Sequence, residues 1–135
     1  MRPHARSRLA RLEFLSFLIW PDFCSALIHD LVDSGIDFDG AFCMTDTIAI
    51  GFVRGLADRG LRVPDDVAVI GFDGIRECED YIPSLSTVAT DLNDLAAKAM
   101  RLLLDRLDED GKGTPLPART LTADFRLIAR ESTRR

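Results

Sequence analysis

The hydrophobic and polar positions of residues 38–83 follow three successive patterns, which predict a strand, a helix and a second strand. Residues 41–44 form an apolar run that stops at Thr45-Asp46, and residues 67–70 are apolar on both faces, as in a buried parallel strand. The segment between these runs has apolar residues at helical spacing: Ile48, Phe52, Val53 and Leu56. Either Thr45 or Asp46 can cap this helix, because a side-chain oxygen there accepts a free backbone N–H. We therefore expect a right-handed βαβ unit.

The remaining pattern predicts elements on both sides of this unit. A helix is expected from about residue 22 to residue 34, after a buried strand that ends near Trp20. Residues 86–88 predict a short strand, and an amphipathic helix capped by Asp91 covers residues 92–109. The tail after this helix begins with a loop containing Gly and Pro and then predicts one or two short strands. Alternating helices and strands of this kind indicate an α/β protein with a mainly parallel sheet.

Composition narrows the classes of partner and site. The chain has 135 residues, which is typical of one domain with its own core, and a net charge of −5. An acidic protein is not suited to bind phosphate backbones, so direct contact with DNA is not expected. The three cysteines form no C-x-x-C pair and fit a reducing compartment. The two histidines are isolated, so we expect no metal site and no cofactor.

The first twenty residues combine a basic start with an apolar stretch, which superficially resembles a secretory signal. Glu13 interrupts that stretch, and Pro21-Asp22-Phe23 is not a small-residue cleavage site. The apolar run is also too short to span a membrane. We interpret it as part of the buried strand and expect a cytoplasmic protein without a membrane partner.

Polar residues follow both strands of the predicted βαβ unit at their carboxyl ends. Thr45 and Asp46 come after the first strand and Asp73 comes after the second, so parallel pairing brings them to one edge of the sheet. A carboxylate at Asp73 can accept two sugar or ribose hydroxyls, whereas Asp46 is also explained as a helix cap. A phosphoacceptor aspartate needs a lysine at a strand end, and the only lysines are Lys98 and Lys112. No hydrolytic triad is recognisable, so an enzyme is not expected.

At these residues the chain resembles a known family. The run FCMTDTIAIGFVRGLADRGLRVPDDVAVIGFDG, followed by YIPSLSTV and the ending RESTRR, is similar to the sensor domain of LacI/GalR-type transcription regulators. The resemblance implies a three-layer αβα lobe of the periplasmic-binding-protein type. In the family, two such lobes close on a small sugar- or nucleoside-like effector and alter operator binding by a helix-turn-helix. Residues 1–135 match only the C-terminal part of such a sensor, without the helix-turn-helix and without the N-terminal lobe.

The resemblance also implies a set of ligand-facing positions: Asp73, Thr45, Trp20, Arg8 and Thr90. Arg8 matches the second arginine of the family's A-R-x-R-L segment, and Trp20 matches an aromatic that packs on the ligand. Only eleven residues separate Arg8 from Trp20, fewer than the family has there. A solvated basic tail for Arg8 and a core position for Trp20 therefore remain alternatives. Thr45 stands where many members have Asn, and Thr90 stands near a family glutamine.

Two further expectations come from the family. Its sensor dimer uses the counterparts of the 46–59 helix and of residues 78–82, which implies a homodimer through five positions: Ile50, Val53, Cys78, Tyr81 and Ile82. The counterpart of the 92–109 helix packs on the N-terminal lobe. In this chain its apolar stripe must either dock back on the C-terminal lobe or stay partly exposed.

These observations together predict the effector-sensing part of a LacI/GalR-like regulator. The DNA partner would be reached only through a separate helix-turn-helix. The alternative is a stand-alone sugar- or solute-binding lobe related to periplasmic binding proteins, and an enzyme is a third reading.

Overall fold

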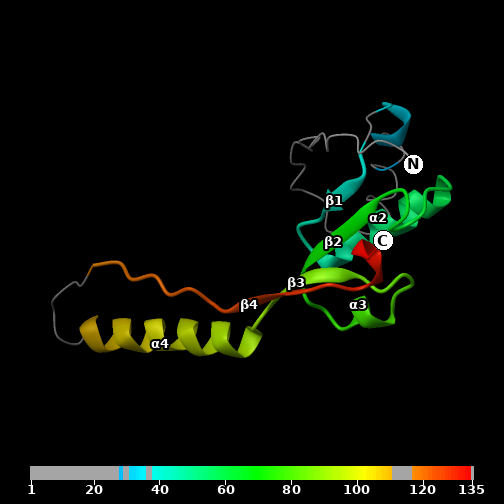
Figure 1. Cartoon of the computed structure of the whole chain (residues 1–135). Helices are drawn as coiled ribbons and strands as arrows, with labels where there is room; N and C mark the ends of the chain where they lie inside the picture. Colours follow the sequence, from blue (N-terminus) through cyan, green and yellow to red (C-terminus); the bar gives the residue numbers. More distant parts are fainter. Residues whose placement is uncertain (1–27, 29–30, 36–37, 111–116, 135) are drawn as a thin grey trace. The chain divides into compact units, whose positions relative to one another are not determined.

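The computed structural model describes residues 28, 31–35, 38–110 and 117–134 (Figure 1). The predicted strand ending near Trp20 and most of the predicted 22–34 helix lie outside these residues. The chain divides into two compact units. Unit 1 contains Met1–Val88 and Leu127–Arg135, and unit 2 contains Ala89–Arg126.

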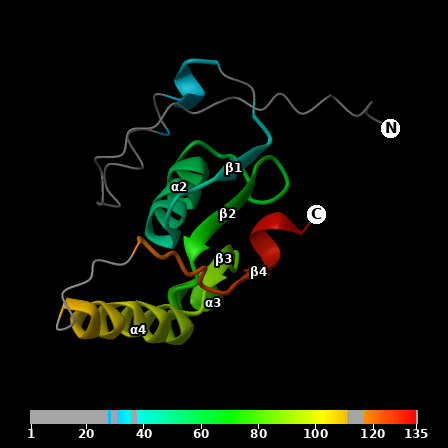
Figure 2. The ribbon, with the colours of Figure 1, turned by 90° about the vertical axis from the view of Figure 1, so that its left-hand side faces the viewer.

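Unit 1 is built on the predicted strand-helix-strand. Strand β1 (Gly40–Phe42) pairs in parallel with β2 (Ala68–Asp73), with Ala41 opposite Val69, and helix α2 (Asp46–Asp58) connects them. In Figure 2 α2 lies alongside both strands, and contacts between α2 and β2 are extensive. The first strand ends two residues earlier than predicted, whereas β2 continues through Asp73.

Helix α2 begins and ends where local chemistry predicts. Thr45 is its N-cap, since the Thr45 hydroxyl oxygen accepts the Ile48 N–H at 3.2 Å. Gly60 has a φ of +71°, and the Leu61 N–H bonds back to the Leu56 carbonyl at 3.0 Å, which closes the C-terminal turn.

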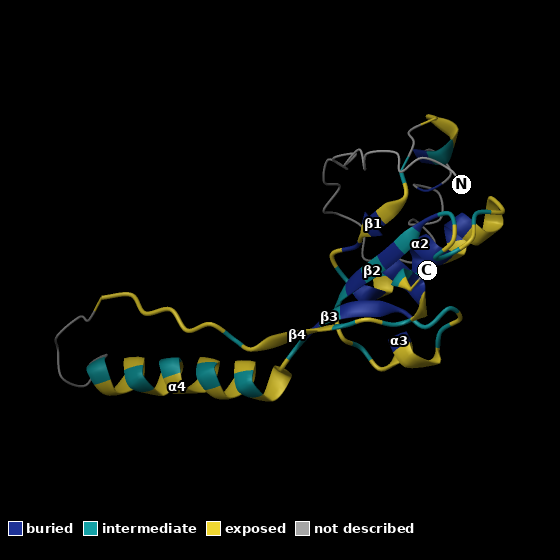
Figure 3. Ribbon diagram, viewed as in Figure 1, coloured by how far each residue is buried: buried dark blue, intermediate teal, exposed yellow. Residues whose placement is uncertain are grey.

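The core of unit 1 lies between α2 and the sheet, where one side of α2 is buried and buried residues alternate with half-buried ones along β2 (Figure 3). A Cβ added to Gly55 would lie 2.9 Å from the Ile28 Cβ, so the helical residue Ile28 packs directly on α2. Glycine at position 55 allows this close packing. The buried apolar residues are Ile28, Leu31, Ala41, Cys43, Ala49, Phe52, Val53, Leu56, Val67, Val69, Cys78 and Leu85.

The sheet has the order β1-β2-β3-β4, with β3 at Ser86–Thr90 and β4 at Phe125–Ile128. A short helix, α3 (Glu77–Asp80), precedes β3, and a 3₁₀ turn (Glu131–Thr133) follows β4. This mixed, mostly parallel sheet with its helices confirms the predicted α/β fold class.

Unit 2 is dominated by helix α4 (Leu92–Asp110), close to the predicted 92–109. Asp91 caps it, because its Oδ1 accepts the Asn93 and Asp94 N–H groups, both at 3.0 Å. The Lys98 ammonium bonds Asp94 at 2.6 Å and the Thr122 carbonyl at 2.9 Å, which ties the helix to the returning chain. Six large apolar side chains of α4 are exposed: Leu92, Leu95, Met100, Leu103, Leu104 and Leu107.

Within the described part of the chain, no helix is both long enough and apolar enough to cross a bilayer.

Candidate functional site

The candidate site is the edge of the sheet where β1 and β2 end. We call it the strand-end site and define it by Thr45, Asp46, Asp73 and Gly74. The parallel pairing continues past β1, since the Cys43 N–H donates to the Ile70 carbonyl at 2.8 Å. Both polar segments therefore leave the sheet at the same edge, as the sequence predicts.

Thr45 is half-buried at this edge. Its oxygen accepts the Ile48 N–H as the cap of α2, and this bond uses one lone pair only. The hydroxyl proton of Thr45 is still available as a donor to a ligand.

Asp73 is exposed and has a backbone φ of +116°, which places it among conformations that L-residues rarely adopt. The pKa of its carboxyl group is raised, first by partial loss of water around it and second by the negative charge of Asp46. The Asp73 carboxylate is thus presented to solvent on an unusual turn, next to a second acid.

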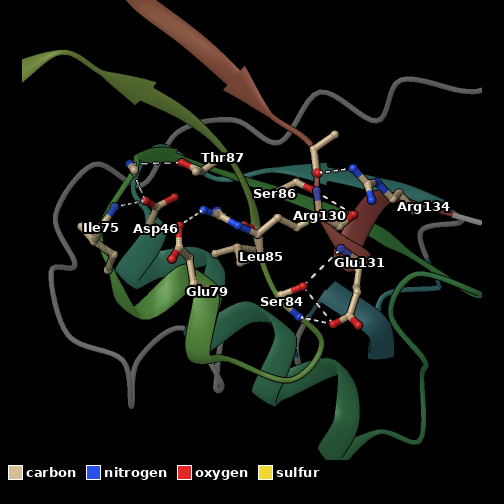
Figure 4. A network of polar contacts seen from close by, with 12 residues as sticks. Asp46, Ile75, Glu79, Ser84, Leu85, Ser86, Thr87, Arg130, Glu131 and Arg134 are labelled. Atoms are coloured by element: carbon tan, nitrogen blue, oxygen red, sulfur yellow. Dashed lines mark hydrogen bonds and ion pairs between the residues drawn. The ribbon is translucent and has the colours of Figure 1, made fainter.

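Asp46 is fully buried and does not cap α2, because Thr45 has that role. Its Oδ2 accepts the N–H of Gly74 at 2.6 Å and the N–H of Ile75 at 2.9 Å (Figure 4). The Gly74 N–H also lies 3.2 Å from the Thr87 hydroxyl oxygen. The two segments that form the strand-end site are therefore joined by a buried carboxylate.

Two buried neighbours surround the Asp46 carboxylate. A Cβ placed on Gly71 would overlap Asp46 Oδ1 and lie 3.1 Å from the Asp46 Cα, so only glycine fits there. The pKa of the buried Cys78 thiol is raised to about 12, mainly by burial and then by its interaction with Asp46. Cys78 therefore stays a protonated core residue.

The other predicted ligand positions are Arg8, Trp20 and Thr90. Arg8 and Trp20 lie outside the described residues. Thr90 is half-buried at the end of β3 and belongs to unit 2. The structure thus brings together Thr45 and the turn at Asp73, and the predicted ligand set as a whole stays a prediction. Sequence reasoning missed the link through Asp46; the available signal was glycine at 71 and 74, on either side of the second strand's end.

The predicted dimer positions divide by burial. Val53 and Cys78 lie in the core and offer no side-chain surface. Ile50 and Tyr81 are half-buried, with the Tyr81 hydroxyl donating to the Ile50 carbonyl at 3.4 Å, and Ile82 is 90% exposed. The dimer itself stays a prediction, for which the accessible residues are Ile50, Tyr81 and Ile82.

Comparison with known proteins decides the family. The model of the periplasmic binding protein-like domain matches residues 7–133, nearly the whole chain. The chain belongs to this family. The periplasmic binding protein-like chain is also 37% identical over 93 residues to the HTH-type transcriptional repressor PurR of Actinobacillus pleuropneumoniae. That match covers 69% of this chain and 27% of the repressor, so the chain spans about a quarter of that relative.

Solved structures agree with this assignment. A LacI-type transcription regulator from Bifidobacterium animalis is 34% identical, with a TM-score of 0.73 over 86% of this chain and 40% of that one. A LacI family regulator from Arthrobacter in complex with lactose is 36% identical, with a TM-score of 0.63 over 84% and 40% of the two chains. The predicted resemblance to LacI/GalR sensor domains is confirmed.

Proposed function

We propose that this chain is the effector-sensing part of a LacI/GalR-like transcription regulator. It binds a small sugar- or nucleoside-like ligand, and binding modulates operator recognition by a DNA-binding domain outside residues 1–135. The observation that carries the proposal is the exposed Asp73 carboxylate, held beside Thr45 at the carboxyl ends of two parallel strands.

The chemistry of this edge suits a polyhydroxylated ligand. A carboxylate such as that of Asp73 accepts two neighbouring hydroxyl protons at once, and the Thr45 hydroxyl donates to a third oxygen. The Arthrobacter regulator, which is similar to this protein over 84% of the present chain and 40% of its own, is in complex with lactose, a molecule of this kind. Trp20, Arg8 and Thr90 are the further ligand positions in this proposal.

The proposal places the protein in the cytoplasm as a binding protein rather than an enzyme, because its relatives regulate transcription. The net charge of −5 disfavours direct binding of this chain to DNA. Operator contacts are therefore assigned to the separate helix-turn-helix.

Chemical-shift titration with lactose, ribose and a purine nucleoside tests the proposal. We expect amide shifts at Thr45 and Gly74 with a dissociation constant on the order of millimolar, because one lobe supplies only part of the contacts. The shifts should disappear in Asp73→Ala and persist in the control Asp80→Ala, which removes an exposed acid of α3. Shifts that survive Asp73→Ala, or none with any probe in the wild type, contradict it.

We also propose a homodimer through the surface around Ile50, Tyr81 and Ile82. An isologous contact needs exposed apolar area, and Ile82 supplies it at 90% exposure. Light scattering should show concentration-dependent association that Ile82→Glu removes. A strict monomer at high concentration, or unchanged association of the variant, argues against this surface.

A further inference from the structure

We propose that Asp46 is a positioning residue that holds the Asp73–Gly74 turn in its ligand-binding conformation. The inference rests on the proposed function of Asp73 as the ligand anchor. It assigns a role to a carboxylate that is fully buried and is not needed to cap α2.

The hydrogen bonds of Asp46 reach the turn directly after Asp73. Its Oδ2 accepts two successive backbone N–H groups, from Gly74 at 2.6 Å and from Ile75 at 2.9 Å. Bonds from N–H groups to a carboxylate are stronger than those between neutral groups. Two such bonds to one oxygen, which Figure 4 draws as dashed lines from Asp46, restrain the backbone that follows Asp73.

The backbone of Asp73 needs such support. A residue with a side chain and a φ of +116° is strained and persists only where its surroundings hold it. Gly74 follows with a φ of +79°, so two consecutive residues leave the ordinary regions. Without the Asp46 carboxylate, the backbone of Asp73 and Gly74 would adopt less strained conformations. The Asp73 side chain would then no longer be held at the strand-end site.

The residues around Asp46 leave room for a buried carboxylate at this position. The side chain is fully buried, which is costly for an acid, and Oδ1 has no hydrogen-bond partner among the described residues. Gly71 leaves room for that oxygen, since any Cβ there would overlap it. A helix cap alone does not explain this arrangement, because Thr45 caps α2.

The charge of Asp46 also acts on Asp73. It contributes to the raised pKa of the Asp73 carboxyl group, after partial burial. The other titratable groups near Asp46 are the Cys78 thiol and, around Cys78, Arg130 and Glu77. Removing the Asp46 charge should therefore lower the pKa of Asp73.

The test compares Asp46→Asn and Gly71→Ala with the control Gly40→Ala by NMR. In Asp46→Asn the neutral amide keeps an acceptor and loses the charge, so the Gly74 and Ile75 amide protons should shift upfield. The titration midpoint of Asp73 should fall, and lactose should bind about tenfold more weakly, equivalent to about 1.4 kcal/mol. Gly71→Ala should disturb the same amides by displacing Oδ1. Gly40→Ala should not, because its Cβ meets only the Ala68 carbonyl at 3.8 Å.

The outcomes separate this inference from the proposed function. Unchanged Gly74 and Ile75 amides with an unchanged Asp73 midpoint in Asp46→Asn overturn the positioning role. If those signals move but the wild type binds none of the probes, the positioning role stands and the proposed function fails. If Asp46→Asn does not fold, hydrogen exchange of the wild type decides. Slow exchange at Gly74 and Ile75 supports the bonds to Asp46, and exchange as fast as in an open loop overturns them.

Discussion

Asp73 combines an exposed carboxylate with a φ of +116°, a backbone conformation in which the Cβ crowds its own peptide groups. Glycine has no such conflict. Strained residues of this kind gather at binding sites, where function rather than stability selects the side chain. At this position the proposed ligand role and the fold therefore place opposite demands on the residue.

Replacing Asp73 by glycine should relieve this strain. We expect Asp73→Gly to be more stable than Asp73→Ala by about 1 kcal/mol, because the strain that the alanine Cβ keeps at this φ outweighs the greater entropy of glycine in the unfolded chain. Urea unfolding of the two variants measures the difference. Both variants should fail to bind sugar. Equal stability of the two would mean that the turn is not strained.

The sequence predicted which residues reach the strand-end site but not how they are held. Thr45 and Asp73 each follow an apolar run that predicts a strand. Because parallel strands end at the same edge of a sheet, this pattern was enough to place the two residues together. The same pattern favoured Asp46 as the helix cap, with Thr45 as the alternative, and the structure assigns the cap to Thr45. The burial of Asp46 depends on Gly71, Gly74 and Thr87, which come from other segments, and no local pattern reports such a contact.

At the scale of elements, the C-terminal turn fastens β3 to the rest of unit 1. The buried Ser132 hydroxyl donates to the Val69 carbonyl at 2.6 Å and accepts the Ser86 N–H at 2.8 Å. Arg130 bonds the Leu85 carbonyl at 2.8 Å (Figure 4). Side chains of the RESTRR ending thus link β2 and β3 by hydrogen bonds, a role that the family resemblance alone did not indicate.

Glu131 makes the stabilisation by this C-terminal turn depend on pH. The pKa of its carboxyl group is lowered from 4.5, first by the Ser84 N–H and then by the Ser84 hydroxyl, which donate at 2.8 and 2.9 Å. The lowered pKa means that the stabilisation is present above pH 4.5 and is lost as pH falls below it. Glu131→Gln should therefore show a flatter dependence of unfolding free energy on pH in that range.

Urea unfolding at several pH values measures this slope. The matched control is Glu77→Gln, which removes an exposed acid of α3 and should keep the wild-type slope. If Glu131→Gln follows the wild type throughout, the bonds to Ser84 do not contribute to stability.

The long elements were predicted best, because caps and periodicity mark their ends. Helices α2 and α4 each match the expected range to within one residue. Strand β1 is only three residues long and ends before the apolar run does, since apolar character continues into Cys43 and Met44. The tail predicted as one or two strands forms a single strand and a 3₁₀ turn, because its polar side chains bond to unit 1.

At the scale of the whole molecule, the apolar stripe of α4 has no cover among the described residues of unit 2. Six large apolar side chains of α4 are exposed in unit 2, and their docking on unit 1 stays a prediction to be tested. The chain spans only 27% of the PurR relative that it matches over 93 residues. An exposed apolar stripe of this kind favours aggregation.

Hydrogen exchange can test this state in solution. Amides of residues 92–109 should exchange faster than those of residues 67–70 in β2, because an uncovered helix opens without breaking the core. Leu103→Glu should reduce aggregation without lowering the stability of unit 1. Equal protection of the two segments would show that α4 has docked.

The way in which the chain enters and leaves unit 2 indicates how a segment of that unit could be deleted. The Asp91 N–H donates to the Asp124 carbonyl at 3.0 Å, so the chain leaves and re-enters unit 1 along neighbouring strands. We therefore expect that most of unit 2 can be removed without unfolding unit 1. An Asn-Gly turn joining Asp91 to Asp124 would convert β3 and β4 into a hairpin. That shortened chain should unfold cooperatively in urea, whereas loss of cooperativity would show that unit 1 depends on the removed helix.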